Sequence, residues 1–465
     1  MVGLGIALSG LEAQQSVIAV TSHNVANAST PGYSDQVATL VANPPYSPPA
    51  LHQNNGPGQY GMGVTVGSIT RQTSQFLSLQ TWSNNGELGD SNQTTQTLNQ
   101  VEALLNEPSS TGLNNQLDQF WNAWQSLGND PQSTAARSQV VAAGQALTSQ
   151  FNQLDSQLST MQGNLDASVS QQVGVVNQLS GQIANLNQLI SADTAAGQHP
   201  NDLEDQRDQL VGQLANVIPV SVSWQKNGEV TVSAGTVAVV DGSQVLQLQA
   251  TPNPANHNYQ ALSWGPGGVA ATFTGGMMGA LLNLRDQTIP GYRSQLDQLA
   301  AGIAGQVNTL QTGGSDLQGN PGQAFFEPSS GTVTAANISV NPALASNPGL
   351  VAAAATPFQG SGDGSNAVQI ADLQNSAFLD GNTSTPSDFL ASFVGQLGSD
   401  AAAAQSAQTN AQTLQQSISQ QQQQVSGVSV DQEMTTMVEA QNAYAAAAKV
   451  STTIDTMLGD LINMV

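Results

Sequence analysis

Residues 147–190 read LTSQFNQLDSQLSTMQGNLDASVSQQVGVVNQLSGQIANLNQLI. Apolar residues recur here in alternating steps of three and four, apart from consecutive steps of four around Val169, which would locally disturb a supercoil. The spacing predicts one helix about 65 Å long, at 1.5 Å per residue. Filamentous subunits often need such a rod, whereas globular enzymes seldom do. The apolar stripe consists of Leu147, Phe151, Leu154, Leu158, Met161, Leu165, Val169, Val173, Val176, Leu179, Ile183, Leu186 and Ile190.

The N-terminal segment predicts another helix, over residues 4–27. Its apolar seam repeats every seven positions, and in water such a stripe needs a partner helix. Pro31 cannot continue the helix, and Pro31-Gly32 favours a tight turn before an extended segment from Ser34 to Val41. The seam consists of Leu4, Leu11, Ile18 and Val25, with Ala7 and Leu8 beside it.

The C-terminal segment predicts a helix from about Ser429 to the end of the sequence, after a break at Ser426-Gly427. This helix also carries heptads. The two terminal seams are complementary, so we expect the two helices to pair and to bring the chain ends together. Its seam runs through Val430, Met437, Tyr444, Ser451, Leu458 and Val465, with Ala440, Ala447, Ile454 and Leu461 between them.

The residue pattern in the middle of the chain changes from helical to strand-like and back. A helix containing Leu203, Leu210 and Leu214 is followed, from 220 to 273, by alternating Val, Thr and Ser with Asn-Gly and Asp-Gly turn signals, which predict a small β-rich domain. We therefore predict a mainly α fold with an inserted β-rich domain. Its predicted parts are an inner coiled-coil domain (1–40 and 425–465), a helical middle domain of long helices (41–219, 276–311 and 388–424) and an outer β-rich or irregular region (220–275 and 312–387).

Composition limits the classes of partner. The chain has 465 residues, of which 39% are hydrophobic, so it is long enough to bury real cores. Only 8% are charged, with 31 acidic and 7 basic side chains and a formal net charge of −24. That charge repels phosphate backbones and anionic lipid head groups. We expect no nucleic-acid and no membrane partner.

Cysteine and the N-terminal charge pattern bear on compartment. The chain has no cysteine, so disulfides, thiolate metal sites and cysteine nucleophiles are excluded. No apolar run approaches the ~20 residues of a membrane-spanning helix. The first basic residue is Arg71, so the positive segment that begins a secretory signal is missing. We expect no cleaved signal peptide, and export would need another apparatus.

Residue patterns typical of enzymes are missing. The four histidines are scattered without metal-ligand spacing, and no Gly-Lys-Ser/Thr follows the glycines at 265–268. Around Asp363 the alternating carboxylates of a calcium loop are missing. Glu204 and Arg207 are expected to form an exposed ion pair without chemistry. We predict no enzyme activity, no catalytic residue, no metal and no cofactor.

Motifs at both ends carry a family resemblance. Residues 7–11 (ALSGL) and 24–33 (NVANASTPGY) resemble the N-terminal motif of flagellar rod, hook and hook-associated axial proteins. Residues 426–434 (SGVSVDQEM), with 441–444 (QNAY) and 448–450 (AKV), resemble their C-terminal motif. The internal segments 61–64, 69–71, 203–208 and 296–300 are similar to the hook-associated branch at the hook-filament junction.

The resemblance implies a structural subunit of the bacterial flagellum, exported unfolded by the flagellar type III apparatus and located extracellularly at the hook-filament junction. The implied partners are neighbouring copies of itself, the hook protein, a second hook-associated junction protein and a cytosolic export chaperone at the C-terminal helix. The expected assembly interface comprises Leu4, Leu8, Leu11, Ile18, Asn24, Val25, Asn27, Pro31, Gly32, Tyr33, Val430, Met434, Met437, Gln441, Tyr444, Ile454, Leu458 and Leu461.

Two alternatives remain open at this point. A hook or distal rod protein has both end motifs, although the rod at 147–190 and the segment 205–208 argue against it. A secreted coiled-coil adhesin would explain the polar helices, but it would not explain the two end motifs.

Overall fold

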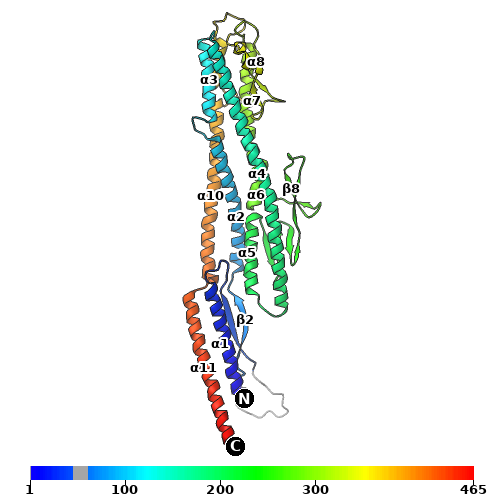
Figure 1. Cartoon of the computed structure of the whole chain (residues 1–465), viewed down its shortest axis with the longest axis vertical. Coiled ribbons are helices and arrows are strands. Elements are labelled where there is room, and N and C mark those ends of the chain that lie inside the picture. Colours follow the sequence, from blue (N-terminus) through cyan, green and yellow to red (C-terminus); the bar gives the residue numbers. More distant parts are fainter. Residues whose placement is uncertain (1, 45–60, 465) are drawn as a thin grey trace. The chain divides into compact units, whose positions relative to one another are not determined.

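The computed structural model describes residues 2–44 and 61–464, and helices dominate it (Figure 1). The helices are α1 (Val2–Asn27), α2 (Gln75–Leu105), α3 (Leu113–Asn129), α4 (Thr134–Ala195), α5 (Asn201–Val217), α6 (Gly276–Asn283), α7 (Ile289–Gly313), α8 (Pro342–Ser346), α9 (Ser365–Asp372), α10 (Pro386–Ser426) and α11 (Val430–Asn463). The strands are β1 (Gln36–Ala42), β2 (Val64–Arg71), β3 (Ser221–Trp224), β4 (Val230–Ala234), β5 (Val237–Asp241), β6 (Gln244–Val245), β7 (Leu248–Pro252), β8 (Gln260–Trp264), β9 (Val269–Ala270), β10 (Phe326–Pro328) and β11 (Ile338–Val340). The predicted fold class, mainly α with an inserted β-rich region, is confirmed.

Helix α4 contains the predicted rod and extends beyond it at both ends, to 62 residues. Every member of the predicted stripe is buried except Leu186, which is half-buried. The stripe also survives the consecutive steps of four around Val169, where the helix continues without a break. The apolar period therefore determined both the helix and its buried side.

The chain divides into two compact units, which we describe separately. The first contains the described residues up to Gly86, together with Val175–Leu248 and the residues from Ala411 onward. The second contains Glu87–Gly174 and Gln249–Asn410.

In the first unit, α1 and α11 lie side by side and run antiparallel, so that the start of α1 and the end of α11 lie at the same end of the pair (Figure 1). A Cβ added at Gly3 would lie 3.2 Å from Cδ1 of Ile454, and one added at Gly10 would lie 3.6 Å from Cβ of Ala447. The two helices therefore keep one register over about two turns, because a step of seven residues along α1 matches a step of seven residues back along α11. Small residues let the two backbones approach closely.

Two small antiparallel sheets complete the first unit. Strands β1 and β2 pair from Gln36 opposite Arg71, with an irregularity between Thr39 and Leu40. Strands β3 to β6 form a meander. The predicted Asn227-Gly228 and Asp241-Gly242 turns connect β3 to β4 and β5 to β6, and both glycines have positive φ. Such turns favour glycine because a left-handed backbone strains other residues.

The second unit has an aromatic core. Phe120 and Trp124 of α3 pack against Phe325 and Phe326, with ring centroids 5.4 to 5.7 Å apart. The segment 312–387, which the sequence predicted to be β-rich or irregular, contains the β10–β11 pair, the short helices α8 and α9 and connecting turns. Strands β7 to β9 form the other sheet of the β-rich region.

Candidate functional site

The segment that follows α1 turns sharply, as the Pro31-Gly32 pair predicts. The amides of Thr30 and Tyr33 donate to the carbonyls of Asn27 and Thr30. Gly32 has φ +79°, and a Cβ there would collide with the side chain of Gln209. The left-handed backbone conformation therefore favours glycine at this position, whereas the exposed Gln209 side chain could move aside.

Asn24 joins three parts of the first unit. Its side chain is 1% exposed. The amide Nδ2 donates to Asp35 Oδ1 (2.7 Å), Gln36 O (2.8 Å) and Glu433 Oε2 (3.0 Å), while Oδ1 accepts from the Tyr33 hydroxyl (2.6 Å). Asn24 therefore holds the end of α1, the segment after the turn and the start of α11 in one fixed arrangement.

Two carboxyl groups meet at that amide. An amide nitrogen carries two hydrogens, so its three acceptors compete for them. Burial and the nearby Glu433 carboxylate raise the pKa of Asp35 to about 6, although a hydrogen bond from the Gln36 amide acts in the opposite direction. Burial also raises the pKa of Tyr33, as do Asp202 and Asp35, so its hydroxyl remains a donor at neutral pH.

Arg71 fastens strand β2 to helix α5. Its guanidinium lies 2.8 Å from carboxylate oxygens of Glu204, Asp205 and Asp208, and its side chain is 11% exposed. Burial alone would lower the pKa of Arg71, but these three carboxylates raise it. Asp205 also accepts hydrogen bonds from the backbone amide and the hydroxyl of Ser34, both at 2.8 Å.

The expected exposed pair between Glu204 and Arg207 is wrong. Glu204 pairs with Arg71, while Arg207 is 1% exposed and donates to Asp208 and, at 2.7 Å, to the carbonyl of Gly228. The side chains three residues apart point to different partners. Arg207 instead fixes the β3–β4 turn.

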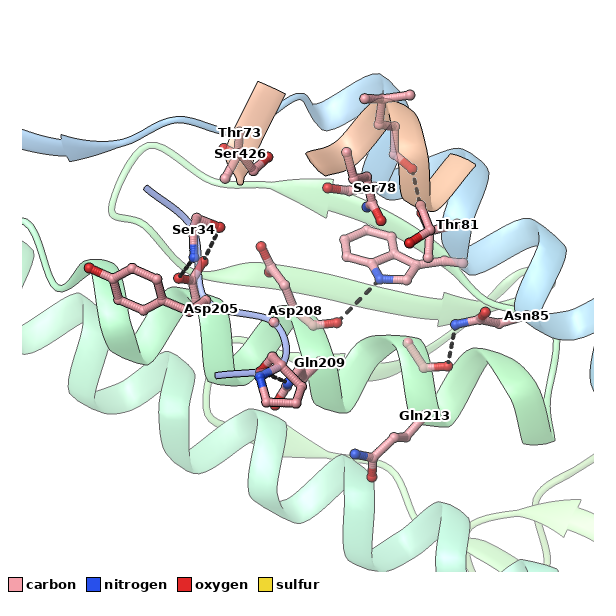
Figure 2. A pocket seen from close by; sticks show the side chains of 18 of the residues that line it. Ser34, Thr73, Ser78, Thr81, Asn85, Asp205, Asp208, Gln209, Gln213 and Ser426 are labelled. Atoms are coloured by element: carbon pink, nitrogen blue, oxygen red, sulfur yellow. Dashed lines mark hydrogen bonds between the residues drawn. The ribbon is translucent and has the colours of Figure 1, made fainter. Parts of the chain in front are cut away.

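A cleft of about 1100 Å³ opens beside these groups (Figure 2). It is lined by the turn after α1 and by parts of α2, α4, α5 and the end of α10. Figure 2 shows Ser34 bonded to Asp205 and hydroxyl and amide side chains around the remaining wall. Its charged lining groups, Arg71, Asp205 and Asp208, already satisfy one another. This arrangement offers hydrogen bonds without an activated nucleophile or base.

Apolar side chains are exposed on the paired terminal helices. We call the following set the terminal apolar surface: Ile6, Leu8, Val430, Met434, Val438, Tyr444, Val450, Met457, Ile462 and Met464, whose exposed fractions run from 38% to 79%. Val430, Met434 and Val438 recur every four residues, so they lie along one side of α11. Glu433 and Ala440, which are buried, recur with Ala447 and Ile454 every seven residues on the side that faces α1.

The structure places the expected interface residues in three environments. Asn24 is buried. Half-buried are Leu4, Leu11, Ile18, Val25, Asn27, Tyr33, Met437, Ile454 and Leu458, and exposed are Leu8, Pro31, Gly32, Val430, Met434, Gln441 and Tyr444. Leu461 lies outside the residues whose side chains the structure describes.

The sequence did not predict the buried charged groups that contact Asn24 and surround Arg71. Glu433 was not among the predicted interface residues, yet its side chain is 8% exposed and accepts a hydrogen bond from Asn24. Asp35, Arg71 and Asp205 were not singled out as site residues. Spacing along the sequence could not name these partners, because Asn24 and Glu433 are 409 positions apart and Arg71 and Glu204 are 133 apart.

Within residues 2–44 and 61–464, no group of three or more His, Asp or Glu side chains is placed to hold a metal ion. In the same described part of the chain, no helix combines the length and apolar character that crossing a membrane requires.

Comparison with protein families now separates the chain into recognisable parts. The family profile described as "Flagellar hook-associated protein FlgK helical domain" matches residues 98–326. The profile "Flagella basal body rod protein" matches residues 4–33, and "Flagellar basal body rod FlgEFG protein C-terminal" matches residues 419–464. The resemblance carried by the two end motifs is therefore confirmed.

Individual proteins give the same result. Flagellar hook-associated protein 1 of Bacillus subtilis is 32% identical over 99% of this chain and 97% of its own length. The protein of the same name from Salmonella typhimurium is 29% identical over 69% of this chain and 58% of its own length. The structure of the flagellar hook junction protein FlgK from Burkholderia pseudomallei matches the fold with a TM-score of 0.68 at 18% identity, over 75% of this chain and all of that one. With a relative above 30% identity along nearly the whole sequence, this chain belongs to the flagellar hook-associated protein 1 family, whose members are structural components of the flagellum.

Proposed function

We propose that this chain forms the junction between hook and filament and that copies of it assemble through their terminal helices. The terminal apolar surface carries the proposal. Solvent contact with ten large apolar side chains on two paired helices is unfavourable, and burying a Val or Met contributes roughly 1.5 to 3 kcal/mol. A tube of neighbouring copies would cover this surface.

The end motifs have a structural role in the same proposal. Asn24, Tyr33 and Glu433 fix the direction in which the chain leaves the helix pair, and Gly32 permits the turn. A fixed exit direction is what a repeating assembly needs, because each copy must present the same surfaces. In this proposal residues 1–40 and 425–465 form the inner domain, and the helical and β-rich parts form the middle and outer ones.

The proposal extends to location and partners. The chain would leave the cell through the flagellar type III apparatus without a cleaved signal peptide, and it would lie outside the cell. Its neighbours would be further copies, the hook protein and a second hook-associated junction protein, and a cytosolic chaperone would hold the C-terminal helix before export. Exposed apolar residues on α11 support the need for such a chaperone.

Deletion of the gene tests the position in the flagellum. The expected cells have hooks but no filaments, and they shed flagellin into the medium, because the filament has no attachment. Electron microscopy of the cells and immunoblots of the medium measure both results. Cells that lack hooks altogether would instead indicate a hook or rod protein.

Substitution tests the surface. The double variant M434D/V438D changes side chains that are 49% and 51% exposed, so the purified variant should keep its helix content while failing to restore swimming. V269D, at a 69% exposed valine of β9, is the matched control and should restore it. Normal swimming with M434D/V438D would contradict assembly through this side of α11.

A further inference from the structure

Five of the seven basic side chains are arginines that hold parts of their own chain together. Each arginine is bound to carboxylates or carbonyls of its own chain, and four of the five side chains are at most 11% exposed, against 30% for Arg293. None of them is available as a free surface charge. Their main partners are Glu204, Asp205 and Asp208 for Arg71, Pro131 for Arg137, Gly228 for Arg207, Asp166 and Asp286 for Arg285, and Asp155 for Arg293.

The remaining two are lysines, and both are exposed. Lys226 lies in the turn between β3 and β4, and Lys449 lies on α11. Neither forms a salt bridge among the residues that the structure describes. On a chain with 31 acidic side chains, a cation on the assembly helix is exceptional.

Lys449 has no acidic neighbour on its own helix within reach. Positions three and four residues away on α11 are the ones that meet a helical side chain. Here they are Ala445, Ala446, Thr452 and Thr453, and the two threonine hydroxyls donate to the carbonyl of Lys449. The neighbours of the Lys449 ammonium on α11 are therefore small side chains, which would let the helix of another copy approach closely.

Helix α1 carries the complementary group. Among its 26 residues, Glu12 is the only Asp, Glu, Lys or Arg. Glu12 is exposed, and it too forms no salt bridge among the described residues. Lys449 is thus the one Lys or Arg of α11, and Glu12 is the one acidic residue of α1. Neither has an ion-pair partner among the described residues.

We infer that Lys449 of one copy pairs with Glu12 of a neighbouring copy. The inference rests on the proposed assembly through the terminal helices. A repeating contact joins two different surfaces, so the α11 face of one copy meets the α1 face of the next. Burying the charge of Lys449 or Glu12 without a partner would cost free energy, because the charge loses its hydration. Pairing the two charges offsets this loss and selects one register between neighbouring copies.

Cysteine cross-linking tests the contact in intact flagella, because the chain has no cysteine of its own. Under mild oxidation the E12C/K449C variant should give a ladder of covalently linked copies on a non-reducing gel. E12C/K226C is the matched control and should give no ladder. A single fast-migrating band from an intrachain disulfide, or no cross-link in flagella that assemble normally, would overturn the inference.

Charge reversal gives the second measurement. K449E should lose swimming, E12K should also lose it, and K449E/E12K should regain it, while K226E behaves like the parent chain. Helix content of each purified variant shows that folding is unchanged. Normal swimming with K449E, or no recovery in the double variant, would contradict the pairing of Lys449 with Glu12. If M434D/V438D fails while K449E swims, assembly through α11 stands and only the ion pair is excluded.

Discussion

At the scale of single residues, the site depends on buried polar side chains whose hydrogen-bonding groups are all in use. Asn24 uses both ends of its amide, and Arg71 uses its whole guanidinium on three carboxylates of α5. Removing one partner of such a group leaves the other buried and unsatisfied, which costs more than the bond itself contributes. These contacts therefore specify geometry as well as stability.

Asp35 predicts a pH dependence. Its pKa is raised to about 6 from 3.8, so the folded state binds the proton more tightly than the unfolded state. The associated stability is fully present below pH ~4 and is lost as pH rises through about 6. We expect D35N, which keeps the oxygen that accepts from Asn24, to melt at a higher temperature than the parent at pH 7.5.

Thermal melts followed by circular dichroism across pH 4 to 8 measure this effect. The difference between D35N and the parent should grow from pH 4 to pH 7 and then remain constant. D431N is the control, because Asp431 is an exposed carboxyl at the start of α11. A constant difference over the whole range would show that Asp35 does not titrate there.

At the scale of elements, periodicity predicted the helices well and their long-range partners poorly. The stripe from Leu147 to Ile190 fixed α4, and Asn227-Gly228 fixed a hairpin, because both signals are local. The links from Asn24 to Glu433 and from Arg71 to Glu204 join positions 409 and 133 residues apart. No local spacing encodes such pairs. The same limitation explains the wrong Glu204–Arg207 pair.

Helix pairing predicts opposite outcomes for two glycines of α1. A Cβ at Gly10 already touches Ala447, so G10L would force α1 and α11 apart at a cost of about 1 to 3 kcal/mol. A Cβ at Gly5 meets nothing within 4 Å, so G5L should leave the pair intact. Hydrogen exchange of α11 amides in the purified chain should be faster in G10L than in G5L. Equal protection in the two variants would contradict the register.

At the scale of the whole molecule, composition and the two ends were more informative than the middle. The end motifs identified the axial family, and a relative matched over 99% of the chain confirms it. The strand order within 220–273 and the short elements of 312–388 were not predictable in detail. Their cores combine residues from separate segments, such as Phe120 with Phe325, so each segment alone carries a weak pattern.

Net charge predicts how salt affects association of the purified chain. Copies with a formal charge of −24 repel one another, and the screening length falls from about 30 Å at 0.01 M to about 3 Å at 1 M salt. We expect self-association to strengthen as sodium chloride is raised, because one Lys449–Glu12 pair is small beside the total repulsion. Sedimentation measures the association, with sucrose of equal osmolality as the control. Weaker association at high salt would contradict this expectation.

The antiparallel pairing of α1 and α11 also has a consequence for labelling. Because the first and last described residues lie at the same end of the helix pair, a fluorescent tag fused to either terminus would sit beside the proposed assembly surface (Figure 1). The turn between β7 and β8, where Pro254 and Ala255 are exposed, offers a better insertion point for an epitope. Imaging this protein in living cells is therefore best attempted with an internal label.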